Sequence, residues 1–509
     1  MNARVMILFP NTSNDGVIPL AVGILSTIAK NAGCQVHYFE STFYNKRNTA
    51  TEDHEIAGEF QCVKDRKKSD YPPMKQFYLD FRNALFSFRP QILAVHVNSL
   101  EWELFKEIMA NVSFPDPAPF VIAGGVHASI DPESVISEPF IDAVCVGEGE
   151  DVWADFIAAI NSNGSIVDLH GLWVRTPEGI RKNPKRSLIK AVHLWDIPVD
   201  YSFFDDRHLL KPYDGQMRRR GLIEYSRGCP FNCYYCVNSA LKEKFRGLGK
   251  FFRVRPFKNF QQGVYRLKSM GAEILQLQDE CFLFNNIADI KRFCDWYGEE
   301  IRLPLLLQTR PESVTVENIS LIAKMRIPVQ ITLGVESGSP RILGDICNRH
   351  MSIDIIKNAF EVIHHYGLRS SAYCMIGFPT ETRQEVFQTI RLIRHVQPTI
   401  AIMSVFYPFP GVPLRKFCVD RGFIKGDELA RTFTDDTILV RQPMSPREIK
   451  NIRRCFRIYT KLPVKYLSHV ERCERDFENN RELFAKLVKL SWSNEALDYQ
   501  NKENICLSI

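Results

Sequence analysis

The sequence lacks a long apolar run, a regular pairing of cysteines and a strong excess of one charge. A membrane-spanning helix needs about 20 apolar residues, and no run approaches that length. The 14 cysteines are scattered, which favours a reducing cytoplasm over a disulfide framework. A net charge of +6 over 509 residues gives no nucleic-acid footprint. We therefore expect a cytoplasmic protein that binds no nucleic acid, while peripheral membrane contact stays open.

Length and composition set the scale of the fold. A chain of 509 residues is too long for one hydrophobic core, so we expect two or three domains. With 45% hydrophobic and 24% charged residues, the composition is that of an ordinary soluble globular protein. The apolar run at the start ends at Pro10, which predicts a first strand. That run is too short for a signal peptide and has no small-residue cleavage site.

The first third of the chain alternates strand-like and helix-like segments. Apolar and β-branched runs predict strands, and apolar residues at helical spacing predict helices. The expected strands are 5–9, 35–40, 91–97, 120–123 and 142–146, and the expected helices are 19–32 and 77–88. Residues 41–75 are polar and irregular, which indicates an insertion with loops. The alternation predicts a Rossmann-like, doubly wound parallel sheet over residues 1–165.

A connector is expected over residues 166–218. Two short runs around Pro177-Glu178-Gly179 predict a small hairpin. The basic run Arg218-Arg219-Arg220 is interpreted as a solvated linker that could also touch an anionic cofactor or substrate.

A second α/β series follows the connector. Its expected strands are 222–225, 274–277, 305–307, 329–333, 371–376 and 400–406, and its expected helices are 257–270, 286–297, 316–324, 354–366 and 383–395. Six strand–helix repeats predict a partial (β/α)6 barrel of the TIM type over residues 219–420, with functional groups at the carboxyl ends of its strands. The charged segment 421–509 is mostly helical by pattern.

Three cysteines on one short loop, Cys229, Cys233 and Cys236, carry the strongest chemical signal. The spacing C-x3-C-x2-C offers three thiolates to a [4Fe-4S] cube and leaves the fourth iron without a protein ligand, whereas most such cubes take four cysteines. A zinc site would need four ligands, commonly with a second cysteine pair downstream, and no clear second pair follows. A disulfide would need an oxidising compartment.

Together with groups at later strand ends, this loop resembles the radical S-adenosylmethionine (SAM) superfamily, whose motif is C-x3-C-x-aromatic-C. Tyr235 fills the aromatic slot. The strand-end groups are Gln278-Asp279-Glu280, Gln308-Thr309-Arg310, Gly334-Val335-Glu336-Ser337-Gly338-Ser339, Gly377-Phe378-Pro379 and Tyr407-Pro408-Phe409-Pro410-Gly411. The resemblance covers about 190 residues, with boundaries good to a few residues.

The resemblance implies roles for these residues. The open iron would be chelated by the amino and carboxylate groups of SAM. Glu336 and Ser337 would bind its ribose, and Arg310 would pair with its carboxylate. Asp279 and Glu280 would contact the methionyl part, and Tyr235 would pack on the adenine side. Many relatives place a lysine about a dozen residues after the glutamate; the nearest candidates here are Asn348, Arg349 and His350.

A second constellation lies in the first third of the chain. Glycines at strand ends let a backbone approach a large ligand closely. Gly124 and Gly125 follow one predicted strand and Gly147 follows the next. The spacing of these glycines resembles the cobalamin-binding domain that precedes many radical SAM cores, and Pro19-Leu20 and Gly23 match that domain as well. The implied cobalamin-binding residues are Ser99, Gly124, Gly125, His127, Gly147 and Glu148. A dinucleotide or flavin site, or plain turns between strands and helices, stays open.

One departure concerns the axial ligand of cobalt. Cobalamin domains that supply a histidine carry Asp-x-His-x-x-Gly after the first strand, but here Pro10-Asn11-Thr12-Ser13 follows. Asp53-His54 differs in both spacing and place. We therefore expect cobalamin bound base-off, without a histidine from that motif. His96 and His127 lie at strand ends, where a structural hydrogen bond is the more common role.

The resemblance implies a cobalamin-dependent radical SAM enzyme that uses a [4Fe-4S] cluster, SAM and cobalamin. The expected reaction is methyl transfer from methylcobalamin to a radical that the 5′-deoxyadenosyl radical makes on an unidentified organic substrate. The spent cobalamin must be reduced again, which implies an external electron donor such as flavodoxin or ferredoxin. The alternatives are a cobalamin-dependent rearrangement, cyclisation or oxidation, and a radical SAM enzyme without cobalamin. A non-catalytic sensor is disfavoured by the full set of strand-end groups.

Overall fold

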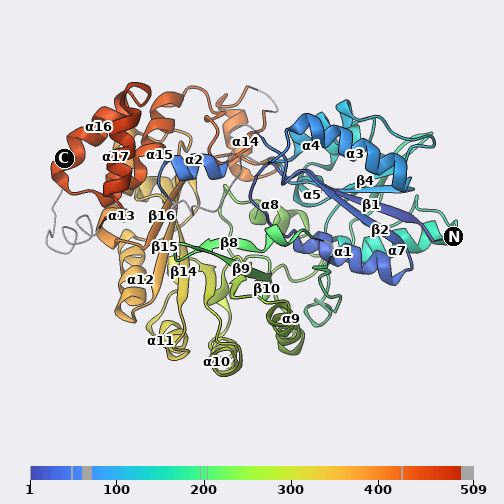
Figure 1. Cartoon of the computed structure of the whole chain (residues 1–509), viewed down its shortest axis with the longest axis horizontal. Helices are drawn as coiled ribbons and strands as arrows, with labels where there is room; N and C mark the ends of the chain where they lie inside the picture. Colours follow the sequence, from blue (N-terminus) through green and yellow to red (C-terminus); the bar gives the residue numbers. More distant parts are fainter. Residues whose placement is uncertain are drawn as a thin grey trace.

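The computed structural model describes residues 2–46, 50–59, 71–194, 196–202, 204–425 and 428–493. Two α/β units lie side by side, with helices of the last part of the chain stacked on the second (Figure 1). The predicted architecture of a Rossmann-like unit, a barrel-type sheet and a helical C-terminal region is confirmed. No helix in the described ranges combines the length and the apolar character that a bilayer crossing requires.

The first unit is a seven-stranded sheet in the order β2-β1-β3-β4-β5-β6-β7. Strands β1 to β5 are parallel, and β6 and β7 add to the edge in antiparallel fashion. Its strands are β1 Arg4–Phe9, β2 Gln35–Glu40, β3 Ile92–His96, β4 Phe120–Gly124, β5 Ala143–Cys145, β6 Leu172–Thr176 and β7 Gly179–Lys182. Its helices are α1 Leu20–Asn31, α3 Met74–Phe88, α4 Trp102–Asn111, α5 Val126–Ile130, α6 Pro132–Ser137 and α7 Gly149–Asn161.

The second unit is a curled sheet in the order β16-β15-β14-β13-β12-β9-β8. Strands β9, β12, β13, β14, β15 and β16 are parallel, and β8 pairs with β9 in antiparallel fashion. The strands are β8 Leu210–Tyr213, β9 Gln216–Ile223, β12 Ile274–Leu277, β13 Leu305–Thr309, β14 Val329–Glu336, β15 Arg369–Ile376 and β16 Ile400–Val405. The helices between them are α8 Val237–Lys244, α9 Phe257–Ser269, α10 Ile287–Trp296, α11 Val316–Lys324, α12 Ile353–His365 and α13 Arg383–Val396.

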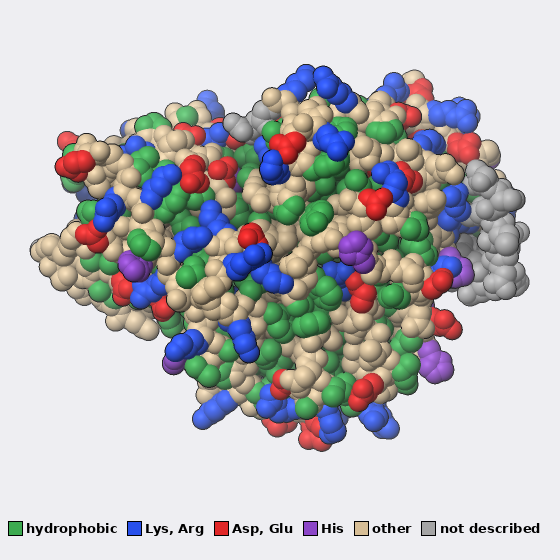
Figure 2. Space-filling view, turned by 180° about the vertical axis from the view of Figure 1, so that it is seen from behind, with side chains coloured by type: hydrophobic (Ala, Val, Ile, Leu, Met, Phe, Trp, Pro, Cys, Tyr) green, Lys and Arg blue, Asp and Glu red, His purple; other side chains and the backbone are tan. Residues whose placement is uncertain are grey.

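The remaining elements connect or cover these two sheets. Apolar positions of α15 and α13 pack together, and α15 also contacts β16. The elements are α2 Ala50–Ile56, the two-residue strands β10 Ser226–Arg227 and β11 Arg253–Val254, and the helices α14 Pro413–Asp420, α15 Pro446–Lys461, α16 Leu467–Arg475 and α17 Arg481–Leu490. Figure 2 shows basic and acidic side chains interspersed over one face, as the small net charge leads one to expect.

The prediction that Arg218-Arg219-Arg220 forms a solvated linker is wrong. These residues lie in β9, which starts at Gln216. Asp214 and Gly215 form a two-residue turn with φ angles of 49° and 73°, the conformation that Asp-Gly favours between antiparallel strands. This turn pairs β8 with β9, so the connector joins both sheets: β6 and β7 extend the first and β8 the second.

The expected insertion at 41–75 contains a helix that reaches the second unit. Helix α2 lies beside α15 (Figure 1). The amide N–H of Met403 in β16 donates to Glu59 Oε1 at 3.1 Å. The indole N–H of Trp492 donates to the carbonyl of Gly58 at 3.0 Å. The first unit is therefore anchored on the far side of the barrel as well as at the domain boundary.

Candidate functional site

The cysteine loop lies between β10 and α8, at the carboxyl end of β9. Cys236 occupies the position just before α8, and its N–H donates to the carbonyl of Cys233 at 3.1 Å. Cys233 is buried, and Cys229 and Cys236 are partly exposed. Burial raises the pKa of the Cys229 and Cys236 thiols to about 12. The described residues hold no group of three potential ligands close enough for a single metal ion, but a four-iron cube separates its thiolates more widely.

Asp279 holds the strand that leads into this loop. Its carboxylate accepts the backbone N–H groups of Tyr225 and Ser226 at 2.7 Å each, and also the Ser226 hydroxyl. The side chain is fully buried, and burial raises its pKa to about 6. The contact of Asp279 with SAM stays a prediction; its carboxylate oxygens accept from Tyr225 and Ser226, and it positions the loop. Glu280, the next residue, lines the cavity between the two units that is described below.

Glu336 lies at the end of β14 in the left-handed conformation, with φ of 64°. Its Oε1 accepts the Tyr235 hydroxyl at 2.9 Å and Nη1 of Arg349 at 2.8 Å. Arg349 is 1% exposed and also donates from Nη2 to the carbonyl of Gly334 at 2.8 Å. Sequence reasoning named Arg349 only as a stand-in for an absent lysine. The fold makes it the cation that orients Glu336.

Arg310 points toward the cysteine loop. Its Nη1 lies 3.3 Å from the sulfur of Cys233, and its guanidinium lies 3.8 Å from the centre of the Phe231 ring. Glu312 pairs with the other side of the guanidinium. A planar cation beside a cluster ligand can take a carboxylate in bidentate fashion. This position therefore suits the role that the resemblance implies for Arg310.

Ser337 does not face the site. It is fully buried, its Oγ accepts the N–H of Ser339 at 3.1 Å, and it lies 3.3 Å from the hydroxyl of Thr389 in α13. Its hydroxyl secures the turn after β14 against α13, and the contact of Ser337 with the ribose stays a prediction.

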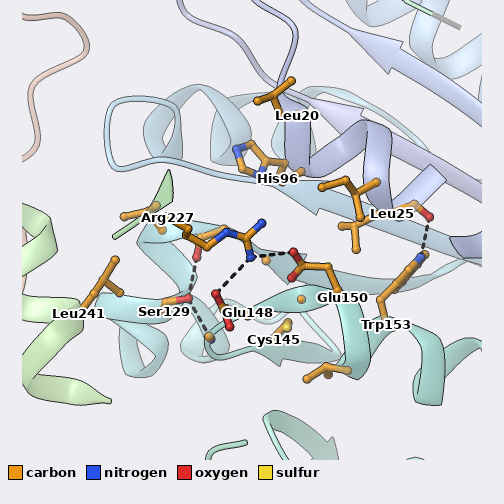
Figure 3. A pocket seen from close by; sticks show the side chains of 18 of the residues that line it. Leu20, Leu25, His96, Ser129, Cys145, Glu148, Glu150, Trp153, Arg227 and Leu241 are labelled. Carbon is orange, nitrogen blue, oxygen red and sulfur yellow. Dashed lines mark hydrogen bonds and ion pairs between the residues drawn. The ribbon is translucent and has the colours of Figure 1, made fainter. Parts of the chain in front are cut away.

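A cavity of about 380 Å³ separates the carboxyl edge of the first sheet from the cysteine loop (Figure 3). Gly124, Gly125 and Gly147 line it from the first unit. From the second unit its walls include Glu224, Arg227, Gly228, Asn238, Leu241 and Glu280, and its apolar walls include Ile7, Leu20, Leu25, Ala94, Ile122 and Val126. A large, flat, mostly apolar ligand placed here would face both units at once.

Two of the glycines are required by their surroundings. Gly125 has φ of 108°, and a Cβ there would lie 2.7 Å from the carbonyl oxygen of Val97. Gly147 has φ of 115°, and a Cβ there would lie 2.8 Å from the ring of Phe245 in the second unit. Both positions therefore require glycine, and the backbone at this edge of the cavity carries no side chain there.

A network of ion pairs crosses the cavity wall (Figure 3). Arg227, two residues before Cys229, donates from Nη1 to Glu148 at 3.1 Å and to Glu150 at 2.8 Å. Arg253 donates to both oxygens of Glu148, at 2.7 and 2.9 Å. Glu148 was expected to bind cobalamin, and it does line the cavity, but its carboxylate is held by these two arginines. It couples the carboxyl edge of the first sheet to the cysteine loop.

The histidines at the strand ends have different surroundings. His127 is buried and lies 3.0 Å from the hydroxyl of Ser99, and neither residue belongs to the cavity lining. Ser99 and His127 form a pair with each other, the structural role favoured for His127, and their contact with cobalamin stays a prediction. His96 does line the cavity (Figure 3), and burial lowers its pKa to about 4, so it is neutral at pH 7. His54 pairs with Glu59 beside Arg453 and does not belong to the cavity lining.

Comparison with known proteins gives consistent matches. Residues 223–393 match the family model of the radical SAM superfamily. An uncharacterized methyltransferase of Pyrococcus horikoshii is 27% identical over 340 residues, which are 66% of this chain and 71% of that protein.

Two solved structures share the arrangement of both units. One is the radical SAM methyltransferase TsrM from Kitasatospora setae with cobalamin and a [4Fe-4S] cluster bound (TM-score 0.61, 16% identity, 83% of this chain and 78% of that chain). The other is OxsB, a cobalamin-dependent SAM radical enzyme (TM-score 0.61, 15% identity, 98% of this chain and 75% of that chain). At these identities the likeness establishes the fold, and the predicted fold class is confirmed.

Proposed function

We propose that this chain, whose residues 223–393 form a radical SAM domain, is a cobalamin-dependent radical SAM methyltransferase. One observation carries the proposal: the glycine-lined edge of the first sheet and the residues flanking the cysteine loop line the same cavity. A cofactor bound by the first unit would thus lie directly opposite the loop that holds the cluster. TsrM, with the same fold, is a methyltransferase described with both cofactors.

The donor set of the cysteine loop suits a [4Fe-4S] cluster with one open iron. Cys229, Cys233 and Cys236 supply three thiolates. Cys281, the nearest further cysteine in sequence, is buried against the hydroxyls of Thr309 and Ser313 at 3.2 and 3.3 Å. Tyr235, Arg310, Glu336 and Glu280 remain our candidates for contacts with SAM. Arg349 joins them as the residue that positions Glu336.

The cavity suits a corrin better than a dinucleotide. A dinucleotide fingerprint needs a third glycine for close packing of helix and strand; after Gly147 and Gly149 that position is Val152. Apolar walls, two bare glycine positions and one neutral histidine are instead what a broad macrocycle with peripheral amides can use. We propose Gly124, Gly125, Gly147 and His96 as cobalamin contacts, with the backbone of Glu148 beside them.

When bound, the cluster and SAM supply a carbon-centred radical, and cobalamin supplies a methyl group. The residues of the chain orient and shield these groups. Arg227 ties the cysteine loop to the strand ends of the first unit, and apolar side chains such as Leu20 and Leu25 exclude water from the space between. A cytoplasmic location and a flavodoxin- or ferredoxin-type electron donor belong to the same proposal.

The second candidate is a cobalamin-dependent radical reaction without methyl transfer. It is favoured by OxsB, which covers nearly the whole chain and is described only as a radical enzyme. The two reactions leave different products from SAM, since methyl donation yields S-adenosylhomocysteine and reductive cleavage yields 5′-deoxyadenosine.

The test is an anaerobic incubation of the reconstituted protein with SAM and a chemical reductant, with and without cobalamin. We expect 5′-deoxyadenosine to depend on the three cysteines and S-adenosylhomocysteine to depend on cobalamin. Formation of 5′-deoxyadenosine alone, with cobalamin bound, would favour the second candidate. Formation of neither product would contradict both.

A further inference from the structure

A second cavity, of about 400 Å³, occupies the lumen of the barrel-type sheet, distinct from the cavity at the domain boundary. Residues of β9, β12, β13, β14, β15 and β16 line it, together with Glu59 and Trp492. The polar lining includes Arg220, Gln276, Gln308, Gln330, Thr332, Ser371 and Tyr373. Three glutamines on three adjacent strands give this lumen a neutral surface that can both donate and accept hydrogen bonds.

The acidic side chains of this lining are paired with other cations. Asp214 pairs with Arg369 at 2.6 Å. Glu59 is fully buried, bonds to His54 and to the N–H of Met403, and lies 3.9 Å from Arg453. Neither carboxylate neutralises Arg220, the remaining cation of the lining.

Arg220 is a partly buried guanidinium whose hydrogen-bond partners in the described part of the chain are all neutral. Nη1 donates to the amide oxygen of Gln276 at 3.1 Å, and Nη2 donates to the carbonyl of Pro212 at 3.1 Å. Its Nε is buried with no acceptor among the described residues. Burial lowers the pKa of Arg220 to about 10, and the groups that oppose this shift are the hydroxyls of Tyr373 and Tyr213. A partly buried cation without a counter-charge is incompletely compensated, and a bound anion would supply the missing charge.

We propose that the lumen binds the organic substrate through an anionic group, a carboxylate or a phosphate-type oxyanion, that pairs with Arg220. The hydroxyl of Tyr373 and the glutamine amides would complete the contacts. This inference rests on the proposed function and adds the chemical class of the substrate to it.

The position of Arg220 agrees with that role. Arg220 lies three residues before Ile223, the last residue of β9, and it pairs in register with Ile274 of β12. At 3.3 Å per residue, the anion would lie about 10 Å below the strand ends. Tyr373 pairs with Gly334, two residues before Glu336, and its side chain is 45% exposed, toward this lumen. An anchored small molecule would thus extend from Arg220 toward the proposed SAM contacts.

The test measures anion binding by the full chain with calorimetry, using inorganic phosphate and succinate as probes against sodium chloride of equal ionic strength. We expect saturable binding of at least one probe in the millimolar range, and the stronger probe identifies phosphate-type or carboxylate chemistry. Arg220→Met should weaken binding about tenfold or more, because a charge-assisted pair is lost. The affinity of Arg220→Lys should lie between those of the unchanged protein and Arg220→Met, because lysine keeps the charge but lacks the planar guanidinium.

The matched control is Arg218→Met, two positions earlier on β9, whose partner is Glu273 at 3.3 Å. It should bind both probes as the unchanged protein does. Absence of saturable binding, or equal binding by Arg220→Met with an unchanged melting temperature, would overturn the inference. If Arg220→Met fails to fold, the comparison of Arg220→Lys with the unchanged protein decides. Cleavage of SAM by the same preparation tests the proposed function separately, because it needs no ligand on Arg220.

Discussion

Arg349 donates to Glu336 across 2.8 Å, thirteen residues further along the chain and almost completely buried. Arg349 stands near the position where many relatives have a lysine and this sequence has none. Tyr235 donates to the same carboxylate oxygen, so the aromatic position of the cysteine motif and the end of β14 meet at one atom. This arrangement explains how the proposed SAM contacts are organised without the expected residue.

Arg349→Met should be strongly destabilising. It leaves Glu336, whose side chain is 12% exposed, beside Tyr235 without its cation, and removal of one partner of a largely buried pair costs about 3 kcal/mol or more. Urea unfolding of the cofactor-free protein measures the change, and Arg349→Lys should restore part of it. Arg481→Met removes an exposed pair with Glu478 and should cost less than about 1 kcal/mol. A similar cost for both substitutions would refute the assigned role of Arg349.

Asp279→Asn should release the cysteine loop. The amide keeps the shape of the side chain, but its NH₂ group opposes one of the N–H donors of Tyr225 and Ser226 that the carboxylate accepts. We expect less iron per chain after reconstitution and desalting, together with a stability loss of about 2 kcal/mol. Asp295→Asn, in an exposed pair with Lys291, serves as the control. Full iron content in Asp279→Asn would show that the loop does not depend on this carboxylate.

Gly147→Ala should lower cobalamin retention and leave the iron content unchanged. The added methyl group meets the ring of Phe245 at 2.8 Å on the cavity edge. Gly179→Ala is the matched control, because Gly179 has a similar positive φ of 129° but open space around its Cβ position. Comparison of the two variants separates the effect of backbone strain, which both share, from the effect of the contact with Phe245, which only Gly147→Ala makes. Equal cobalamin retention in both variants would contradict the placement of cobalamin in this cavity.

The pairing of Glu148 with Arg253 and Arg227 predicts a dependence of stability on pH. Burial raises the pKa of Glu148, but the hydrogen bonds and charges of the two arginines outweigh it and hold the pKa below its ordinary value. The stabilisation is therefore present above the unfolded pKa of about 4.3 and is lost as the pH falls through the folded value. Urea midpoints at pH 7 and pH 3 should differ more in the unchanged protein than in Glu148→Gln. Identical differences would show that this pair does not couple the units.

The sequence predicted the α/β units and the cysteine loop because both depend on local pattern. The strand at 35–40 agrees with β2, and Cys229, Cys233 and Cys236 share one loop at a strand end. It missed the start of β9, because three consecutive arginines outweighed the Asp214-Gly215 turn signal. One of these arginines, Arg220, faces the lumen, which a run of charges does not reveal.

Long-range contacts account for the rest of what was missed. The contact between Glu59 and Met403 joins residues 344 positions apart, and no local periodicity encodes it. Ser337 follows Glu336 directly, yet one faces the site and the other packs on Thr389, because the chain turns sharply at the positive φ of Glu336. The roles of Arg227 and Arg253 likewise depend on two acidic residues in another unit.

The most direct test of the account is the cofactor content of the full chain. The protein is reconstituted anaerobically with iron, sulfide and hydroxocobalamin and then desalted, and its visible spectrum, iron and cobalt are measured beside those of the Cys229/Cys233/Cys236 triple alanine variant. We predict about one cobalamin and one four-iron cluster per unchanged chain, and retention of cobalamin without the cluster in the variant. A cluster without retained cobalamin in the unchanged chain would contradict the two-cofactor enzyme proposed here.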